Sequence, residues 1–220
     1  MLQEFKRPKY DENLSSSVSE ELVKIFEKRR TIRQYSNEKP DREIILNAIR
    51  VASLAPSGAN AQPWHFAVIE NQALKEEIKD KCEKEEFDFY HKNPNQKWIE
   101  DLKHLHTHEK KEFLTQAPYL IAIFYSHYSH DQSGEKKTHY YAKESVGLAA
   151  GMLLSSLHLC GLNTLTYTPK RMQFLNDLLE RPKNERPFMI IACGVAPTDC
   201  EVPQISKKTI HEVTNYYQNP

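Results

Sequence analysis

Glycine is scarce in this chain, and so are the motifs that depend on it. Only 6 of the 220 residues are glycine, about 3%, where ~7% is usual. Neither GxGxxG nor GxxxxGK[ST] occurs, although both nucleotide-binding motifs need glycine where the backbone approaches a phosphate closely. A Rossmann or P-loop nucleotide site is therefore disfavoured.

The chain also lacks a surplus of charge and a long apolar run. The 30 Lys+Arg and 30 Asp+Glu residues cancel, and the sequence pI is about 7.1. Nucleic acids and anionic membranes bind surfaces with excess Lys and Arg, so we expect neither as a partner. No stretch approaches the ~18 apolar residues of a membrane span, and the first residues lack a signal peptide's apolar run. The prediction is a soluble cytoplasmic protein.

Motifs for metal binding and for nucleophilic catalysis are missing as well. The four cysteines are 78, 33 and 7 positions apart, which fits neither a metal finger nor a disulfide framework, so reduced and buried thiols are predicted. Of His104, His106 and His108, only the first and third would share a helix face, and HExxH is absent. GxSxG is also absent. We therefore expect no metal site and no serine nucleophile.

The hydrophobic pattern predicts a mixture of helices and strands. Ser17 and Glu20 form a possible capping box for a helix that runs to about Arg29. Apolar residues at helical spacing predict a second helix, from Pro40-Asp41 until Pro56 stops it. Residues 145–160 are apolar nearly all round, which is typical of a helix packed centrally or across a subunit interface.

Three short aromatic and β-branched runs predict strands, at residues 64–69, 119–125 and 188–193. Residues 164–169 resemble the end of another strand, because Pro169 favours an extended Thr168. Residues 75–112, between the first two strands, contain 9 Lys and 11 Asp or Glu among 38 residues. That balance of opposite charges predicts solvated helices.

Three segments could carry binding chemistry, and each also has a simpler interpretation. Residues 29–33, Arg-Arg-Thr-Ile-Arg, suit a phosphate, although basic residues also compensate the end of a helix dipole. The 56–60 turn, Pro-Ser-Gly-Ala-Asn, would let backbone N–H groups approach a ligand, but many such turns are only turns. A hydroxyl at the end of residues 164–168 could donate to a ring nitrogen, or the threonines could simply reflect β-propensity.

Glu86, Tyr90 and Lys111 together would complement a zwitterion. Glu86 and Tyr90 are four positions apart and so share a face of a helix. Glu86 could bind an ammonium, and Tyr90 with Lys111 could bind a carboxylate. The alternative, given the charge density of this region, is an ion-pair network on the surface.

Taken together, these motifs resemble the FMN-dependent nitroreductase superfamily and, within it, the iodotyrosine deiodinase branch. The resemblance covers the chain from about Glu20 to Val213. It rests on Arg29-Arg30-Thr31-Ile32-Arg33, Ala55-Pro56-Ser57-Gly58-Ala59 with Pro63-Trp64, Glu85-Glu86 through Tyr90 to Trp98, Asp101-Leu102-Lys103, Lys111, Ala117-Pro118, His139-Tyr140-Tyr141 with Glu144-Ser145, and Thr166-Tyr167-Thr168-Pro169.

The resemblance implies an α+β, nitroreductase-like fold with a central, mostly antiparallel sheet flanked by helices. It further implies that residues 1–220 form a single FMN domain and that the protein is a domain-swapped homodimer, with two FMN molecules at the interface. In this expectation an active-site lid spans about residues 75–115. A C-terminal extension, about residues 198–220, would embrace the partner subunit.

The resemblance also implies a role for each site residue. Thr168 would donate a hydrogen bond to flavin N5, and the backbone N–H of Ala59 would bind a phenolate, which makes these two the catalytic residues. Glu86, Tyr90 and Lys111 would hold the substrate's amino acid head group, together with Ala59 at the phenolate. The residues expected to bind FMN are Arg29, Arg30, Thr31, Arg33, Pro56, Ser57, Gly58, Thr166, Tyr167, Thr168 and Lys207.

Three of these positions depart from the family's usual pattern. Thr31 replaces a serine and keeps the hydroxyl, whereas Lys207 replaces an arginine that often contacts the phosphate. Tyr167 replaces a smaller residue between two threonines.

The function implied is reductive dehalogenation of halogenated tyrosines, with electrons from a partner reductase or from NAD(P)H. Two alternatives stay open at this point. One is a general NAD(P)H-dependent FMN nitroreductase or quinone reductase, in which Glu86, Tyr90 and Lys111 would be incidental. The other is a non-catalytic flavin or amino-acid binding protein that senses its ligand through ordering of the lid.

Overall fold

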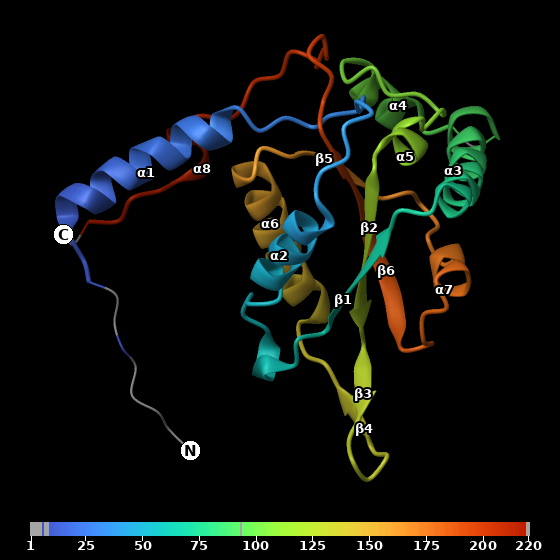
Figure 1. Cartoon of the computed structure of the whole chain (residues 1–220), viewed down its shortest axis with the longest axis horizontal. Helices are drawn as coiled ribbons and strands as arrows, with labels where there is room; N and C mark the ends of the chain where they lie inside the picture. Colours follow the sequence, from blue (N-terminus) through green and yellow to red (C-terminus); the bar gives the residue numbers. More distant parts are fainter. Residues whose placement is uncertain (1–5, 7–8, 93, 219–220) are drawn as a thin grey trace.

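A four-stranded antiparallel sheet forms the centre of the protein (Figure 1). The computed structural model describes residues 6, 9–92 and 94–218. The strand order is β1-β2-β6-β5, and each neighbouring pair is antiparallel. Helices cover both faces of the sheet, so the predicted α+β class is confirmed. The strands are β1 (Trp64–Ile69), β2 (Tyr119–Ser126), β5 (Asn163–Tyr167) and β6 (Glu185–Gly194).

Strand β2 is buried on both faces, and its sequence explains why. Side chains alternate along a strand, so odd-numbered residues from Tyr119 to Ile123 pack on one face and even-numbered residues from Leu120 to Phe124 on the other. All of them are at most 1% exposed. An unbroken apolar run is what a strand covered on both faces requires.

Two layers of helices provide these covers. Helices α2 (Arg42–Ala52) and α6 (Ala142–Leu159) pack against each other and against the odd-numbered face. The other face carries α3 (Gln72–Phe87), α5 (Phe113–Gln116) and α7 (Phe174–Leu178). The predicted central position of α6 is confirmed, since seven of its residues are buried.

Helix α1 (Glu12–Glu27) corrects the predicted N-terminal capping box. The helix begins five residues before Ser17, because Asp11 caps it by accepting a hydrogen bond from the N–H of Leu14 at 3.1 Å. Aspartate is as good an N-cap as serine, and here it comes first. The prediction for α2 was right at its start, where Asp41 is the N-cap, and the helix ends at Ala52, the last of the apolar residues at helical spacing before Pro56.

The first helix and the last segment of the chain both lie away from the sheet (Figure 1). None of the residues of α1 is buried. The tail, which we define as residues 198–218, includes α8 (Ile210–Val213) and is exposed from residue 204 onward. These two segments therefore present apolar side chains to solvent, among them Leu14, Val23, Ile210, Tyr216 and Tyr217.

The remaining elements are short, and most of them were not predicted from the sequence. A hairpin of β3 (Tyr128–His130) and β4 (Lys136–Thr138) extends beyond the end of β2. Helix α4 (Gln96–Lys103) follows the five-residue π-helical turn Asp88–Lys92. Among the described residues, no helix has the length and apolar character needed to cross a bilayer.

The thiols only partly match the prediction. Cys82 and Cys193 are buried in the two cores, whereas Cys160 is exposed and Cys200 is partly exposed. Cys160 is the C-cap of α6, where the helix leaves the core. The predicted burial of all four thiols was therefore wrong for two of them.

Candidate active site

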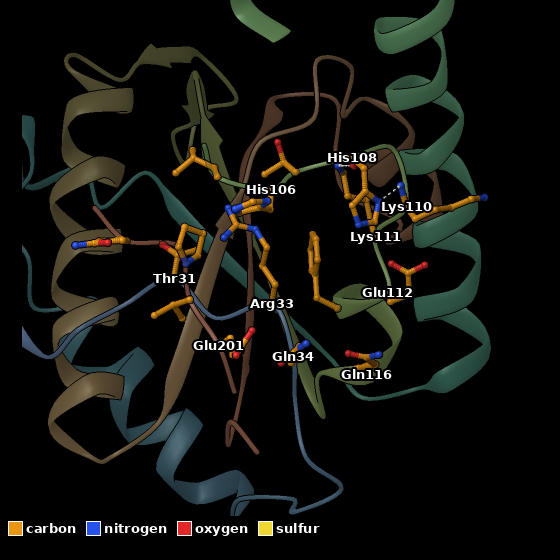
Figure 2. Close-up of a pocket in the computed structure, with 16 residues that line it drawn as sticks. Thr31, Arg33, Gln34, His106, His108, Lys110, Lys111, Glu112, Gln116 and Glu201 are labelled. Carbon is orange, nitrogen blue, oxygen red and sulfur yellow. Dashed lines mark hydrogen bonds between the residues drawn. The ribbon is translucent and has the colours of Figure 1, made fainter. Parts of the chain in front are cut away.

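A cavity of about 640 Å³ opens between residues 75–115, the predicted lid, and the segment that follows α1 (Figure 2). One wall of the cavity is formed by the lid, through residues 105–108, Lys110 and Lys111, and by α5, through Phe113 and Gln116. The other walls are formed by the segment after α1 and by the tail, through Thr31, Arg33, Gln34, Glu201, Val202, Pro203 and Gln204.

The segment after α1 lies along the edge strand β5, and this arrangement places its side chains. Thr31 forms a parallel bridge with Thr164, and the N–H of Ile32 donates to the Thr164 carbonyl at 3.1 Å. Because side chains alternate in extended backbone, Ile32 turns into the core, 6% exposed, while Thr31 and Arg33 face the cavity.

Arg33 is the cation best placed to receive a ligand. It is half-buried, and burial lowers the pKa of its guanidinium. Among the described residues, no carboxylate forms a salt bridge with it. A half-buried guanidinium without a carboxylate favours an anionic or electron-rich group in the cavity.

The other two arginines of the cluster lie outside the cavity lining. A guanidinium N–H of Arg30 donates to the carbonyl of Pro203, which ties the arginine segment to the tail. Arg29 is partly buried, and Lys207 is exposed on the tail. The structure therefore brings Thr31 and Arg33 to the cavity, opposite the lid. Arg30, with Arg29 directly before it, is bound to the start of the tail, and Lys207 lies further along the tail.

The end of β5 places one side chain inward and its two neighbours outward. Thr166 and Thr168 are exposed, whereas Tyr167 packs against the core beneath the lid. None of the three lines the cavity. The Tyr167 hydroxyl donates to Glu86 Oε1 at 2.9 Å, so this residue touches the lid.

Glu86, Tyr90 and Lys111, which are predicted to hold a substrate head group and are called the head-group clamp for that reason, come together in the structure. Glu86 Oε2 lies 3.1 Å from Lys111 Nζ, and these side chains are only 17% and 8% exposed. Lys111 Nζ also donates to the carbonyl of His108 and lies 6.0 Å from the centre of the Tyr90 ring. The alternative of a surface network is therefore wrong for this pair.

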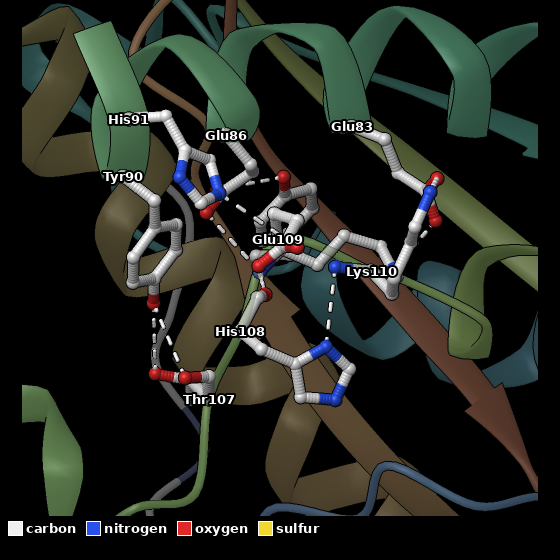
Figure 3. A network of polar contacts seen from close by, with 10 residues as sticks. Glu83, Glu86, Tyr90, His91, Thr107, His108, Glu109 and Lys110 are labelled. Carbon is white, nitrogen blue, oxygen red and sulfur yellow. Dashed lines mark hydrogen bonds and ion pairs between the residues drawn. The ribbon is translucent and has the colours of Figure 1, made fainter.

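Figure 3 shows how the lid folds back on itself to build the clamp. Glu86 and Tyr90 reach from α3 and the following turn toward the segment that carries Thr107 and Lys110. The Tyr90 hydroxyl lies 3.3 Å from both the carbonyl and the hydroxyl of Thr107. Tyr90 therefore holds the segment and makes no direct contact with the carboxylate of Glu86.

Glu83, one helical turn before Glu86, is a site residue that sequence reasoning missed. Its Oε1 accepts a hydrogen bond from the N–H of Lys111 at 2.7 Å, and its Oε2 lies 3.2 Å from Lys110 Nζ. Burial opposes ionisation, but these hydrogen bonds lower the pKa of Glu83 overall. The three-residue spacing to Glu86 was a signal that could have found it.

Two of the four histidines of the lid, His106 and His108, line the cavity. His106 and His108 face the cavity, and His108 Nδ1 accepts a hydrogen bond from the N–H of Lys110 at 3.2 Å (Figures 2 and 3). Within the described ranges, no group of three His, Cys, Asp or Glu side chains could hold a metal ion.

The 56–60 turn is fixed tightly against α6. The N–H of Gly58 donates to Ser145 Oγ at 3.3 Å, and Ser57 Oγ accepts from the N–H of Gln62 at 2.9 Å. A Cβ on Gly58 would lie 2.6 Å from the carbonyl oxygen of Tyr140, so a larger residue would force the backbone of the turn to shift. Ala59 is exposed, with φ of 51° in the left-handed region, a costly conformation for a residue other than glycine.

The structure does not bring this turn to the cavity. The turn and the lid lie at opposite ends of the sheet in Figure 1. Pro56, Ser57, Gly58 and Ala59 are absent from the cavity lining. A single chain therefore carries the two halves of the predicted site at two separate places.

Comparison with known proteins identifies the family to which the chain belongs. A family model described as the Nitroreductase family matches residues 26–195. The chain therefore belongs to the nitroreductase family, and the predicted family is confirmed.

Within this family, the chain is similar to several proteins named iodotyrosine deiodinase. The iodotyrosine deiodinase of Haliscomenobacter hydrossis is 42% identical over 192 residues, 87% of this chain and 86% of that protein. Iodotyrosine deiodinase 1 of Homo sapiens is 38% identical over 95% of this chain and 73% of its own. A crystal structure of oxidised iodotyrosine deiodinase bound to FMN and 3-iodo-L-tyrosine matches with a TM-score of 0.77 and 33% identity, and covers 90% of this chain and 100% of that one.

The residues around the cavity fit one side of a phosphorylated flavin. The half-buried Arg33 and the hydroxyl of Thr31 are donors beside β5, and Arg29 and Arg30 follow in the direction of the tail. Arginine and hydroxyl donors suit phosphate oxygens and the polar edge of a ring. The described residues that line the cavity do not include the 56–60 turn.

Proposed function

We propose that this chain is an FMN-dependent oxidoreductase that removes halogen from halogenated tyrosines. One observation carries the proposal: the partly buried carboxylate of Glu86 and the buried ammonium of Lys111 lie 3.1 Å apart beside the cavity. Opposite charges at this separation complement the ammonium and the carboxylate of an amino acid. The relatives named iodotyrosine deiodinase support the same substrate class.

The FMN would be held from the edge of β5. Arg29, Arg30 and Lys207 would hold the phosphate, and Thr31 with Arg33 would hold the ribityl chain and the ring edge. Thr166, Tyr167 and Thr168 would follow the flavin along the end of β5, with the Thr168 hydroxyl donating to N5. When bound, reduced FMN supplies the two electrons of the reaction.

The substrate would be held at both ends. Glu86 would bind its ammonium, and Tyr90 with Lys111 its carboxylate, while the backbone N–H of Ala59 would bind the phenolate. Two electrons and one proton then replace the halogen by hydrogen, and the products are tyrosine and halide. Lid closure over the ligand would expel water and fix the carbon–halogen bond in position.

A second copy of the chain would complete the site. Pro56, Ser57, Gly58 and Ala59 lie far from the cavity of their own chain, which is the arrangement expected if they serve the partner's flavin. The exposed apolar side chains of α1 and of the tail support the same interpretation, because a homodimer would cover them. We therefore propose a domain-swapped homodimer in which the 198–220 extension embraces the partner; residues 219–220 lie outside the described residues.

The discriminating experiment is a titration of the yellow holoenzyme with 3-iodotyrosine, followed by anaerobic addition of dithionite. We expect quenching of flavin fluorescence, and then release of iodide and tyrosine. Absence of both, together with NAD(P)H-dependent reduction of nitroarenes, would favour the general nitroreductase. Binding without turnover would favour a sensor.

Replacing Glu86 by Gln tests the clamp directly. This change removes the charge and keeps the shape, so we expect affinity for 3-iodotyrosine to fall by about tenfold or more, since it leaves the ammonium without its charged partner. FMN should stay bound. Unchanged affinity for 3-iodotyrosine in Glu86→Gln would contradict the assignment of Glu86.

A further inference from the structure

Tyr167 joins the sheet to the lid at the centre of the clamp. It is the last residue of β5, and its hydroxyl donates to Glu86 Oε1 at 2.9 Å. Its ring packs edge-on against Phe113 of α5, with the ring centres 5.4 Å apart. These contacts fix both the ring and the direction of the hydroxyl.

Tyr167 also lies beside the cation of the clamp. Lys111 Nζ lies 5.8 Å from the centre of the Tyr167 ring, while Glu86 Oε2 lies 3.1 Å from the same nitrogen. The two oxygens of Glu86 are thus divided between two partners. Oε1 is held by a neutral hydroxyl from the sheet, and Oε2 by a charged amine from the lid.

The two partners differ in what substrate binding would do to them. A zwitterion offers a carboxylate to Lys111 and an ammonium to Glu86, so Lys111 can be exchanged for the substrate at Oε2. The hydroxyl of Tyr167 is uncharged, so a substrate carboxylate does not draw it away as it draws Lys111, and it is anchored to a strand of the core sheet. Burial and the nearby Cys82 and Glu86 raise the pKa of Tyr167, so the hydroxyl stays a donor at neutral pH.

We propose that Tyr167 is a positioning residue of the head-group clamp. Its hydroxyl holds one oxygen of Glu86 against β5, so that the other oxygen exchanges Lys111 for the substrate's ammonium without the carboxylate turning away. The inference rests on the proposed function. It assigns Tyr167 a task at the substrate, beyond the flavin contact that the family resemblance implied.

Tyr167→Phe is the test, because it removes the hydroxyl and keeps the ring against Phe113. The FMN-loaded variant is titrated with 3-iodotyrosine and with its deamino analogue, which keeps the ring and the carboxylate but has no ammonium; flavin fluorescence reports binding. We expect affinity for 3-iodotyrosine to fall by about tenfold, and affinity for the analogue to change less than about twofold. A parallel loss for both ligands, or no loss for either, would overturn the proposal.

Tyr119→Phe is the matched control. Tyr119 is a buried tyrosine of the same sheet, and its hydroxyl donates to the Pro40 carbonyl at 2.7 Å, on the opposite face from the lid. This variant should bind both ligands as the unaltered protein does. If the unaltered protein fails to bind 3-iodotyrosine, the proposed function fails; if it binds and Glu86→Gln weakens binding while Tyr167→Phe does not, only the role of Tyr167 fails.

Discussion

The lid and the 56–60 turn, the two halves of the proposed site, reach their geometry by opposite means. The lid uses long charged side chains that pair with one another in a buried place, as Glu86 and Lys111 do. The turn uses small residues, with its backbone fixed by Ser145 and with Ala59 held in the left-handed region. Side chains therefore set what the lid can recognise, whereas backbone shape sets what the turn can approach.

The difference also decides how each half tolerates substitution. A changed charge in the lid leaves its partner buried without compensation. An added methyl in the turn moves the backbone itself, because the obstacle at Gly58 is a carbonyl oxygen rather than a flexible side chain. The two halves should therefore fail in different measurements, one in stability and head-group binding, the other in flavin binding.

Substitution of two glycines by alanine should give the largest effects, because the added Cβ would lie within 2.6 Å of a neighbouring atom at either position. A Cβ on Gly194 in β6 would lie 2.5 Å from Pro118 Cδ and 2.9 Å from the Tyr35 ring. Overpacking of this kind lowers the free energy of unfolding by about 1–3 kcal/mol. We expect Gly194→Ala to show that loss in urea denaturation while FMN affinity stays within about threefold.

Gly58→Ala should give the reverse result. Its Cβ would lie 2.6 Å from the Tyr140 carbonyl oxygen at the surface, so the turn must shift while the core stays intact. We expect FMN affinity, measured by fluorescence titration, to fall by about tenfold. A stability loss like that of Gly194→Ala, with normal FMN affinity, would show that the turn is only structural.

The lid's buried pair should give the next effect. Lys111→Met leaves Glu86 without its cation, and a fully buried pair broken in this way loses about 3–5 kcal/mol. Because Glu86 is 17% exposed, we expect a smaller decrease in the free energy of unfolding, about 1–3 kcal/mol, by urea denaturation at a fixed excess of FMN.

Lys103→Met is the control within the same lid. Lys103 pairs with Glu100 at 3.6 Å, but both side chains are more than 70% exposed, and exposed pairs contribute little. Its stability should match that of the unaltered protein. Equal losses in Lys103→Met and Lys111→Met would mean that burial of the clamp pair has no energetic weight.

The sequence was informative wherever one local pattern determined one structure. The strand at residues 64–69 was predicted at its observed bounds, because six apolar or aromatic residues stand between turn signals. The set Glu86, Tyr90 and Lys111 was predicted through the family resemblance, because the charge density of the region alone favoured a surface network. The short exposed hairpin β3–β4 was missed, because its residues carry no apolar alternation.

What local patterns could not determine was the distance between segments. Nothing in the spacing of Glu83 and Lys111, 28 residues apart, indicated that the carboxylate would accept a hydrogen bond from that N–H. The separation of the 56–60 turn from the cavity likewise depends on the whole sheet lying between them. The start of α1 was also predicted too far along the chain, because Asp11 and Ser17 are both good N-cap residues and Asp11 is the one that caps the helix.

The smallest expected effect compares buried thiols with an exposed one. Burial raises the pKa of Cys193 to about 12, above the ordinary value for a thiol in an unfolded chain. The unfolded state therefore releases its proton first, so the stability that this group contributes is complete below about pH 9 and declines as the pH rises toward 12. Between pH 8 and pH 10 we expect Cys193→Ala to lose less stability than the unaltered protein, by on the order of 1 kcal/mol.

Cys160→Ala is the control, because this thiol is exposed at the end of α6. Its loss of stability between the two pH values should equal that of the unaltered protein. If Cys160→Ala instead reproduces the result for Cys193→Ala, the α6 surface around Cys160 is covered in solution. That outcome would mean that Cys160 is buried in solution. The apolar groove beside it is lined by Val51, Leu148, Met152 and Leu159, and a second copy of the chain could cover this groove.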